Sequence, residues 1–127
     1  MQPPAPKILI VDDDLLSCKV AEAVCTRLGY VSHSVENGKR ALSMLQTYDF
    51  DLVLLDWCMP QMGGAETVVA IRNGDGGGRH AKIPIIVTTA DAFTTTRTRY
   101  LESGATAYML KPLYLHGVSA ILRMWSP

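Results

Sequence analysis

The chain has 127 residues, of which 48% are hydrophobic and 19% charged, a balance typical of one globular domain and not of a disordered or fibrous chain. Its 12 Lys and Arg residues balance 12 Asp and Glu residues, which argues against a nucleic-acid partner, because such binding needs clustered positive charge. No apolar run is long enough to cross a bilayer and the start lacks the features of a signal peptide, so we expect a cytoplasmic domain without membrane contact.

The first elements alternate between strand and helix. The run from Lys7 to Val11 is short, apolar and β-branched, which predicts a strand buried on both faces. After this strand, apolar residues recur at every fourth position as far as Gly29, a residue type that often ends helices. This spacing predicts an amphipathic helix with the recurring residues on its apolar face. They are Leu16, Val20, Val24 and Leu28.

The same alternation continues to the end of the chain. A second strand is expected from Tyr30 to Ser34, and Asn37 is a suitable N-cap for a second helix. The remaining strands are expected at Leu52 to Leu55, Ile83 to Thr88 and Thr106 to Leu110, and the remaining helices at Ala65 to Arg72, Thr94 to Glu102 and around Val118 to Leu122. Five strand-helix units with continuous apolar strands predict an α/β fold, a doubly wound parallel sheet with helices on both faces and right-handed crossovers.

Three regions fall outside this alternation or need their own interpretation. Residues 1–6, rich in proline, are expected to form a disordered lead-in or linker before one domain at residues 7–124. The glycine-rich stretch from Asn73 to Lys82 is expected to be a solvated, mobile loop. The three cysteines are expected to be reduced, and Cys18 and Cys25, a heptad apart on the first helix, to be small core residues.

Polar residues interrupt the apolar runs at the ends of the predicted strands. Asp12 and Asp13 follow the first strand, Asp56 the third, Thr88 and Thr89 the fourth, and Lys111 the fifth. Because parallel strands all end at the same edge of a sheet, three carboxylates, a hydroxyl and an ammonium should converge there. Carboxylates at about 4 Å repel by roughly 4 kcal/mol at an effective dielectric of about 20, so a divalent cation such as Mg²⁺ is expected to offset them. A nucleophilic carboxylate beside a metal and a lysine is suited to phosphoryl transfer.

These strand ends resemble those of the receiver domain of two-component response regulators, over Lys7 to about Leu122. The stretch from Ser17 to Leu42 and the long glycine-rich loop resemble most closely the receivers of hybrid histidine kinases. The resemblance implies a flavodoxin-like (βα)5 fold with strand order 2-1-3-4-5. It rests on four runs: Ile-Leu-Ile-Val-Asp-Asp-Asp at 8 to 14, Leu-Leu-Asp-Trp-Cys-Met-Pro-Gln-Met-Gly-Gly at 54 to 64, Pro-Ile-Ile-Val-Thr-Thr-Ala at 84 to 90 and Gly-Ala-Thr-Ala-Tyr-Met-Leu-Lys-Pro at 104 to 112.

Carried over position by position, the resemblance implies a role for each site residue. Asp56 would be the phospho-acceptor and would bind Mg²⁺ together with Asp12, Asp13 and the backbone carbonyl of Cys58. Lys111 would contact the phosphoryl group, and the peptide bond before Pro112 would be cis. Thr89 would be the switch hydroxyl, and Tyr108 the switch aromatic whose rotamer follows it.

Several residues depart from the pattern or leave a choice. Gly63 stands where the family often has aspartate, which should affect only the start of the following helix. Of the two threonines we choose Thr89, by its spacing to Lys111, and expect Thr88 to point into the helix layer. Asp14 is interpreted as a helix N-terminal charge and not as a ligand. Trp57 is expected near the surface of the site and Trp125 to pack at a helix end.

The function expected from these residues is transfer of a phosphoryl group from a histidine kinase or a histidine phosphotransfer protein to Asp56, followed by a conformational switch. The domain would not be a conventional enzyme, although self-phosphorylation and slow hydrolysis of the aspartyl phosphate are expected. A phosphorylation-dependent dimer is left open, as is the choice between a stand-alone carrier and a piece of a hybrid kinase. One alternative is a Mg²⁺-dependent hydrolase of the haloacid-dehalogenase kind, and another is a degenerate receiver that serves only for docking.

Overall fold

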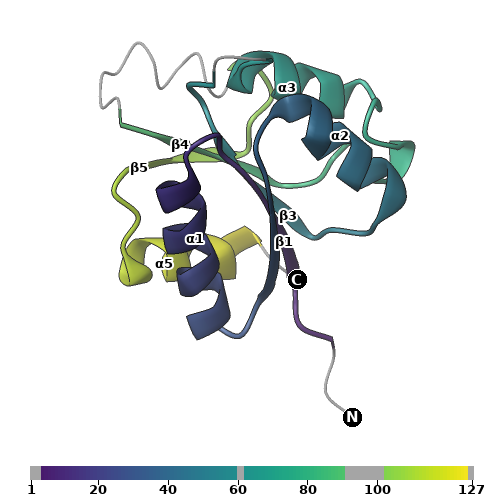
Figure 1. Ribbon diagram of the computed structural model, residues 1–127. Coiled ribbons are helices and arrows are strands. Elements are labelled where there is room, and N and C mark those ends of the chain that lie inside the picture. The colour runs from purple at the N-terminus through teal and green to yellow at the C-terminus, as the bar shows by residue number, and fades with distance from the viewer. Residues whose placement is uncertain (1–3, 60–61, 91–101, 126–127) are drawn as a thin grey trace.

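In the computed structural model, five parallel strands form one sheet in the order β2-β1-β3-β4-β5, which confirms the predicted topology (Figure 1). The structure describes residues 4–59, 62–90 and 102–125, so the expected lead-in is described only from Pro4 onward. The strands are β1 (Lys7–Val11), β2 (Val31–Val35), β3 (Leu52–Asp56), β4 (Ile85–Thr89) and β5 (Ala107–Leu110). Both ends of each strand lie within two residues of the expected bounds.

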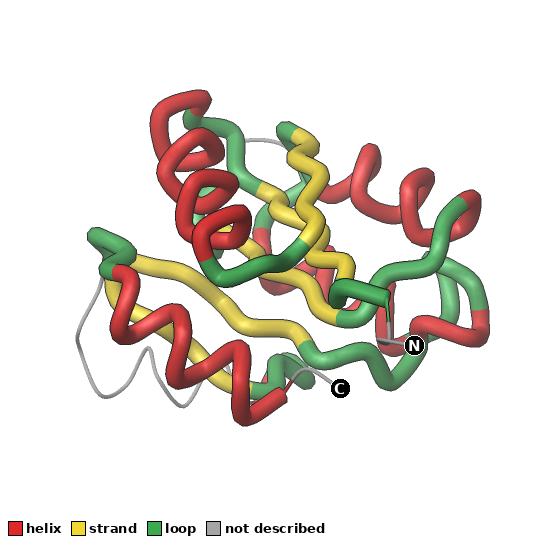
Figure 2. The backbone as a smooth tube through the Cα atoms, turned by 90° about the horizontal axis from the view of Figure 1, so that it is seen from below, coloured by secondary structure: helices red, strands yellow, loops and turns green. Residues whose placement is uncertain are grey.

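Helices cover both faces of this sheet (Figures 1 and 2). They are α1 (Leu15–Arg27), α2 (Gly38–Thr47), α3 (Gly64–Arg72) and α5 (Leu115–Trp125), with a 3-10 turn η1 (Gly78–His80). The helix expected at Thr94 to Glu102 falls outside the described residues except for Glu102. No helix among the residues described here combines the length and the apolar character needed to span a bilayer.

The core consists of two layers, because successive residues of each strand point to opposite faces. Leu9 and Val53 contribute to the layer under α2 and α3, whereas Ile8 and Leu52 contribute to the layer under α1 and α5. The residues of β3 and β4 are buried throughout, as expected for central parallel strands. The expected burial of Cys18 and Cys25 is confirmed, since both lie in the second layer.

The apolar face predicted for α1 is only partly correct. Val24 and Leu28 pack against the core, but Leu16 is 71% exposed and the fully buried positions include Cys18 and Cys25. A spacing of four residues advances about 40° around a helix of 3.6 residues per turn, so a stripe from Leu16 to Leu28 rotates by about 120°. Its first members therefore lie on the solvent side, close to the strand ends.

The glycine-rich segment after α3 packs against the end of α2, which corrects the prediction of a solvated loop, whereas its expected mobility stays a prediction. The Arg79 guanidinium binds the Asp49 carboxylate at 2.7 Å and the backbone carbonyls of Leu45 and Tyr48 at 3.1 Å. His80 is 3% exposed and accepts a hydrogen bond from the backbone N–H of Phe50. The segment thus caps the C-terminus of α2, whose last carbonyls have no partner within the helix.

Candidate functional site

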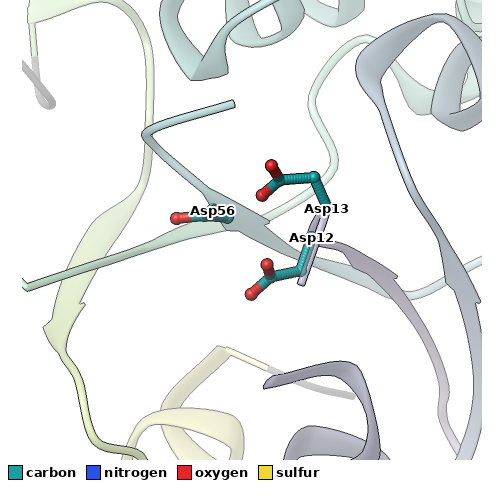
Figure 3. Close-up of side chains that lie close together, drawn as sticks. All are labelled: Asp12, Asp13 and Asp56. Carbon is teal, nitrogen blue, oxygen red and sulfur yellow. The ribbon is translucent and has the colours of Figure 1, made fainter. Parts of the chain in front are cut away.

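Three carboxylates meet at the carboxyl end of the sheet. Asp12 and Asp13 directly follow β1, and Asp56 is the last residue of β3. Because β1 and β3 are paired, with Val11 opposite Leu55, the two strand ends lie side by side. One oxygen of each carboxylate lies within 4.8 Å of the others, and Figure 3 shows the three side chains gathered there. The convergence expected from the strand ends is therefore present.

Burial of the cluster makes its negative charge costly. Asp12 is 5% and Asp56 8% exposed, whereas Asp13 is exposed to solvent. Burial, followed by the charge of Asp12, raises the pKa of Asp56 to about 6, although Lys111 and the backbone N–H of Cys58 act in the opposite direction. Asp56 therefore remains a carboxylate at pH 7, but a more basic one than an exposed aspartate.

Lys111 brings the compensating positive charge from the segment after β5. Its Nζ donates a 2.8 Å hydrogen bond to Asp12 Oδ2 and lies 3.6 Å from Asp56 Oδ1. Burial lowers the pKa of Lys111, but the hydrogen bond to Asp12 and the charge of Asp56 outweigh it, so the pKa lies above its ordinary value. The peptide bond between Lys111 and Pro112 is cis, as expected.

The donor set fits a hard divalent cation. Three carboxylates offer only oxygen ligands, and the carboxylates of Asp12 and Asp56 are directed into one space with Asp13 at its open side. One lysine cannot neutralise three carboxylates, so a net negative charge remains to attract a cation. The Cys58 thiol is exposed. The part expected of the Cys58 backbone carbonyl remains a prediction.

Two threonines end β4, and both are buried. The register pairs Asp56 with Thr88, and paired residues of parallel strands point to the same face of the sheet. Alternation thus places the Thr88 side chain on the same face as Ile86, in the layer under α1 and α5, as expected for a residue that points into a helix layer. Thr89 lies one residue nearer the strand end, and its carbonyl accepts a 2.7 Å hydrogen bond from the Lys111 N–H. Its role as the switch hydroxyl stays a prediction.

Two aromatic residues flank the strand ends on the side of the sheet opposite α1. Tyr108 and Trp57 are half-buried and pack against Val87 and Ala105. The position of Trp57 near the surface beside Asp56 agrees with the expectation. For Tyr108 the packing is compatible with the switch role, which remains a prediction.

The start of α3 is held close to the strand that carries Asp56. A Cβ on Gly64 would lie 2.7 Å from the Trp57 Cα, and the Gly64 N–H donates a 3.0 Å hydrogen bond to the Trp57 carbonyl. Only glycine permits this approach. Gly63, the residue that departs from the family pattern, is the N-cap of α3 and provides no side-chain hydrogen bond there.

Two further features lie beside Lys111 and were not among the site residues expected from the sequence. Ser17 Oγ lies 3.5 Å from Lys111 Nζ and donates a 2.8 Å hydrogen bond to Asp14, the N-cap of α1. The spacing of Asp14 and Ser17 is the recognisable signal, since an N-cap side chain interacts with the residue three positions later. The expected helix-terminal role of Asp14 is thereby confirmed.

The second feature is an apolar surface next to Lys111, which we call the α1 surface. It comprises Leu16, Val20, Pro112 and Leu113, which line a pocket of about 400 Å³ that extends to Lys111. Such a surface beside a reactive site is suited to contact with another protein. The exposed half of the rotating α1 stripe was the signal for it in the sequence.

Comparison with known proteins points in one direction. A family model described as the response regulator receiver domain matches residues 8–123. The sensor histidine kinase GacS of Pseudomonas protegens is 31% identical over 96% of this chain, and the transcriptional regulatory protein ZraR of Klebsiella oxytoca is 37% identical over 84% of it. The chain spans only 13% and 23% of the length of these two proteins.

A solved structure gives the same result for the fold. The receiver domain of the sensor histidine kinase PA1611 from Pseudomonas aeruginosa, crystallised with a magnesium ion coordinated in its active site cleft, superposes with a TM-score of 0.86. The sequences are 29% identical, and the match covers 96% of this chain and 98% of the other.

Proposed function

This chain belongs to the response regulator receiver domain family, and on that basis we propose that Asp56 accepts a phosphoryl group from a phosphohistidine of a partner protein. One observation carries the proposal. A buried carboxylate whose pKa is raised to about 6 stands 3.6 Å from a lysine ammonium and beside two further acids. This combination provides a nucleophile, a cation for the transferred group and donors for a metal ion.

The proposed transfer forms one bond and breaks one. An Asp56 carboxylate oxygen attacks the phosphorus, the bond between phosphorus and the imidazole nitrogen breaks, and its electron pair stays on the ring. Lys111 lies close enough to Asp56 to neutralise charge on the phosphoryl oxygens. Bound Mg²⁺, for which Asp12, Asp13, Asp56 and the Cys58 carbonyl are the proposed ligands, supplies further electrostatic stabilisation.

The product would act as a switch. A dianionic group on Asp56 attracts hydroxyl donors, so we propose that Thr89 moves toward it and leaves space for Tyr108 to reorient. Packing of Tyr108 against Val87 supports this proposal, because Val87 lies on β4 two residues before Thr89. Slow hydrolysis of the acyl phosphate would return the domain to its first state.

The α1 surface is the proposed contact for the phosphodonor. Leu16 and its apolar neighbours adjoin Lys111, so a protein bound there would have its histidine near Asp56. The partner we propose is a histidine kinase or a histidine phosphotransfer protein, in the cytoplasm.

The test compares a phosphoryl donor with a hydrolase substrate. Incubation with acetyl phosphate and Mg²⁺ should add one phosphoryl mass to the protein, and Asp56→Asn should remove this gain. A hydrolase of the haloacid-dehalogenase kind would instead release phosphate catalytically from phosphate monoesters. Cys58 occupies the second position after Asp56, where such enzymes usually carry their acid-base aspartate, which favours the receiver function.

A further inference from the structure

We infer that Ser17 is a positioning residue for Lys111, acting together with Asp14. Lys111 donates to Asp12 Oδ2 at 2.8 Å and lies 3.5 Å from Ser17 Oγ and 3.6 Å from Asp56 Oδ1. The contact with Asp12 is a hydrogen bond, the contact with Ser17 is a longer hydrogen bond, and the contact with Asp56 is an ion pair. Two of these oxygens belong to the segment from β1 into α1, and the third belongs to the proposed phospho-acceptor.

The orientation of the Ser17 hydroxyl follows from its second contact. Its proton is donated to Asp14 Oδ2 at 2.8 Å, which leaves the oxygen lone pairs free to face Lys111. Asp14 is held in turn, because it also accepts the backbone N–H of Ser17 at 3.1 Å and its own N–H donates to Asp12 Oδ1 at 3.0 Å. The negative Asp14 polarises the hydroxyl and makes its oxygen a stronger acceptor.

Ser17 differs from Asp12 in a way that matters during the proposed reaction. Asp12 is a proposed metal ligand, so its oxygens are shared between Lys111 and the cation. Ser17 carries no charge and is not among the proposed ligands. It can therefore hold the ammonium without competing for the cation, and it restricts a side chain that is otherwise flexible along four bonds. Loss of this contact should leave Lys111 with more conformations in which it does not reach Asp56.

This inference rests on the proposed phosphoryl transfer, and the experiment separates the two. Ser17→Ala removes the hydroxyl but keeps the backbone N–H that Asp14 accepts, so the cap of α1 is preserved. The rate of Asp56 labelling by acetyl phosphate should fall about three- to tenfold, as expected for a weak hydrogen bond to a charged group. The Mg²⁺ dissociation constant, measured by calorimetry, should change less than twofold.

Two further variants complete the experiment. Ser17→Thr keeps a hydroxyl and should restore most of the labelling rate, whereas the exposed Ser43→Ala on α2 controls for a serine-to-alanine change in a helix and should label like the wild type. Equal rates for Ser17→Ala and wild type would overturn the inference, as would no recovery in Ser17→Thr or a parallel loss of Mg²⁺ affinity. Absence of labelling in the wild type itself would instead overturn the proposed function.

Discussion

Replacement of Asp56 by asparagine should stabilise the metal-free protein at neutral pH. The substitution keeps the size of the side chain and removes the charge that burial and Asp12 oppose. A rise in pKa from 3.8 to about 6 is about two units, which corresponds to a ceiling of about 3 kcal/mol for keeping the group ionised in the folded state. Because solvent screens part of this charge and the contact with Lys111 is lost, we expect about 1–2 kcal/mol of stabilisation.

The pH dependence gives this prediction its sign. The folded-state pKa of Asp56 lies above the unfolded value of 3.8, so between about pH 4 and pH 6 the folded state binds more protons than the unfolded state. The stabilisation from protonation of Asp56 is complete below the unfolded-state pKa of 3.8 and is lost as the pH rises through the folded-state pKa of about 6. The advantage of Asp56→Asn should therefore be small near pH 4 and reach its full size above pH 7.

Urea unfolding followed by far-UV circular dichroism in EDTA measures this difference directly. Asp75→Asn is a matched control, because Asp75 is exposed and its hydrogen bonds with Gln46 and Ala70 are made by its backbone. Excess Mg²⁺ should make the wild type the more stable protein. A cation that binds the folded state stabilises it, and the wild type offers one more carboxylate ligand than Asp56→Asn. Equal or lower stability of Asp56→Asn in EDTA at pH 7.5 would refute the argument that the cluster is repulsive.

The remaining predictions concern the surroundings of the site. Leu16→Glu should slow phosphorylation by a histidine phosphotransfer protein at least tenfold and leave labelling by acetyl phosphate unchanged. Leu15 is equally exposed but lies outside the pocket beside Lys111, so Leu15→Glu should slow phosphorylation by that protein less. Equal losses of rate in the two variants would count against the α1 surface as the docking site. Thr89→Ala should block the change in the environment of Tyr108 on phosphorylation, which ultraviolet difference spectroscopy measures. Thr88→Ala should leave this change intact, and the opposite result would transfer the switch role to Thr88. Arg79→Ala should lower the free energy of unfolding by about 1–2 kcal/mol without altering labelling by acetyl phosphate. A decrease below about 0.5 kcal/mol would indicate that the contacts of the glycine-rich segment contribute little to the stability of the fold.

The topology and the acid cluster could be predicted from the sequence because each depends on a local pattern. A strand buried on both faces is a continuous apolar run, and β1 shows this from Ile8 to Val11 and β3 from Leu52 to Leu55. Polar residues directly after such runs must lie at the same sheet edge, so Asp12 and Asp56 could be placed together before their distance was known.

Other features depended on contacts that no local pattern records. The exposure of Leu16 follows from the angular drift of a four-residue spacing. The packing of the glycine-rich segment depends on Arg79 binding groups that lie 30 or more residues away. The contact of Ser17 with Lys111 joins residues 94 positions apart. The pairing of Thr88 with Asp56 depends on the register of β3 against β4, which alternation within one strand does not determine.

The location of the acyl phosphate tests the central claim most directly. After incubation with a phosphodonor and Mg²⁺, hydroxylamine converts an acyl phosphate into a hydroxamate on the same carboxyl group, and peptide mass spectrometry then identifies that residue. We expect the hydroxamate on Asp56 alone. A hydroxamate on Asp12 or Asp13, or a phosphoryl group that resists hydroxylamine, would contradict the assignment of Asp56 as the phospho-acceptor.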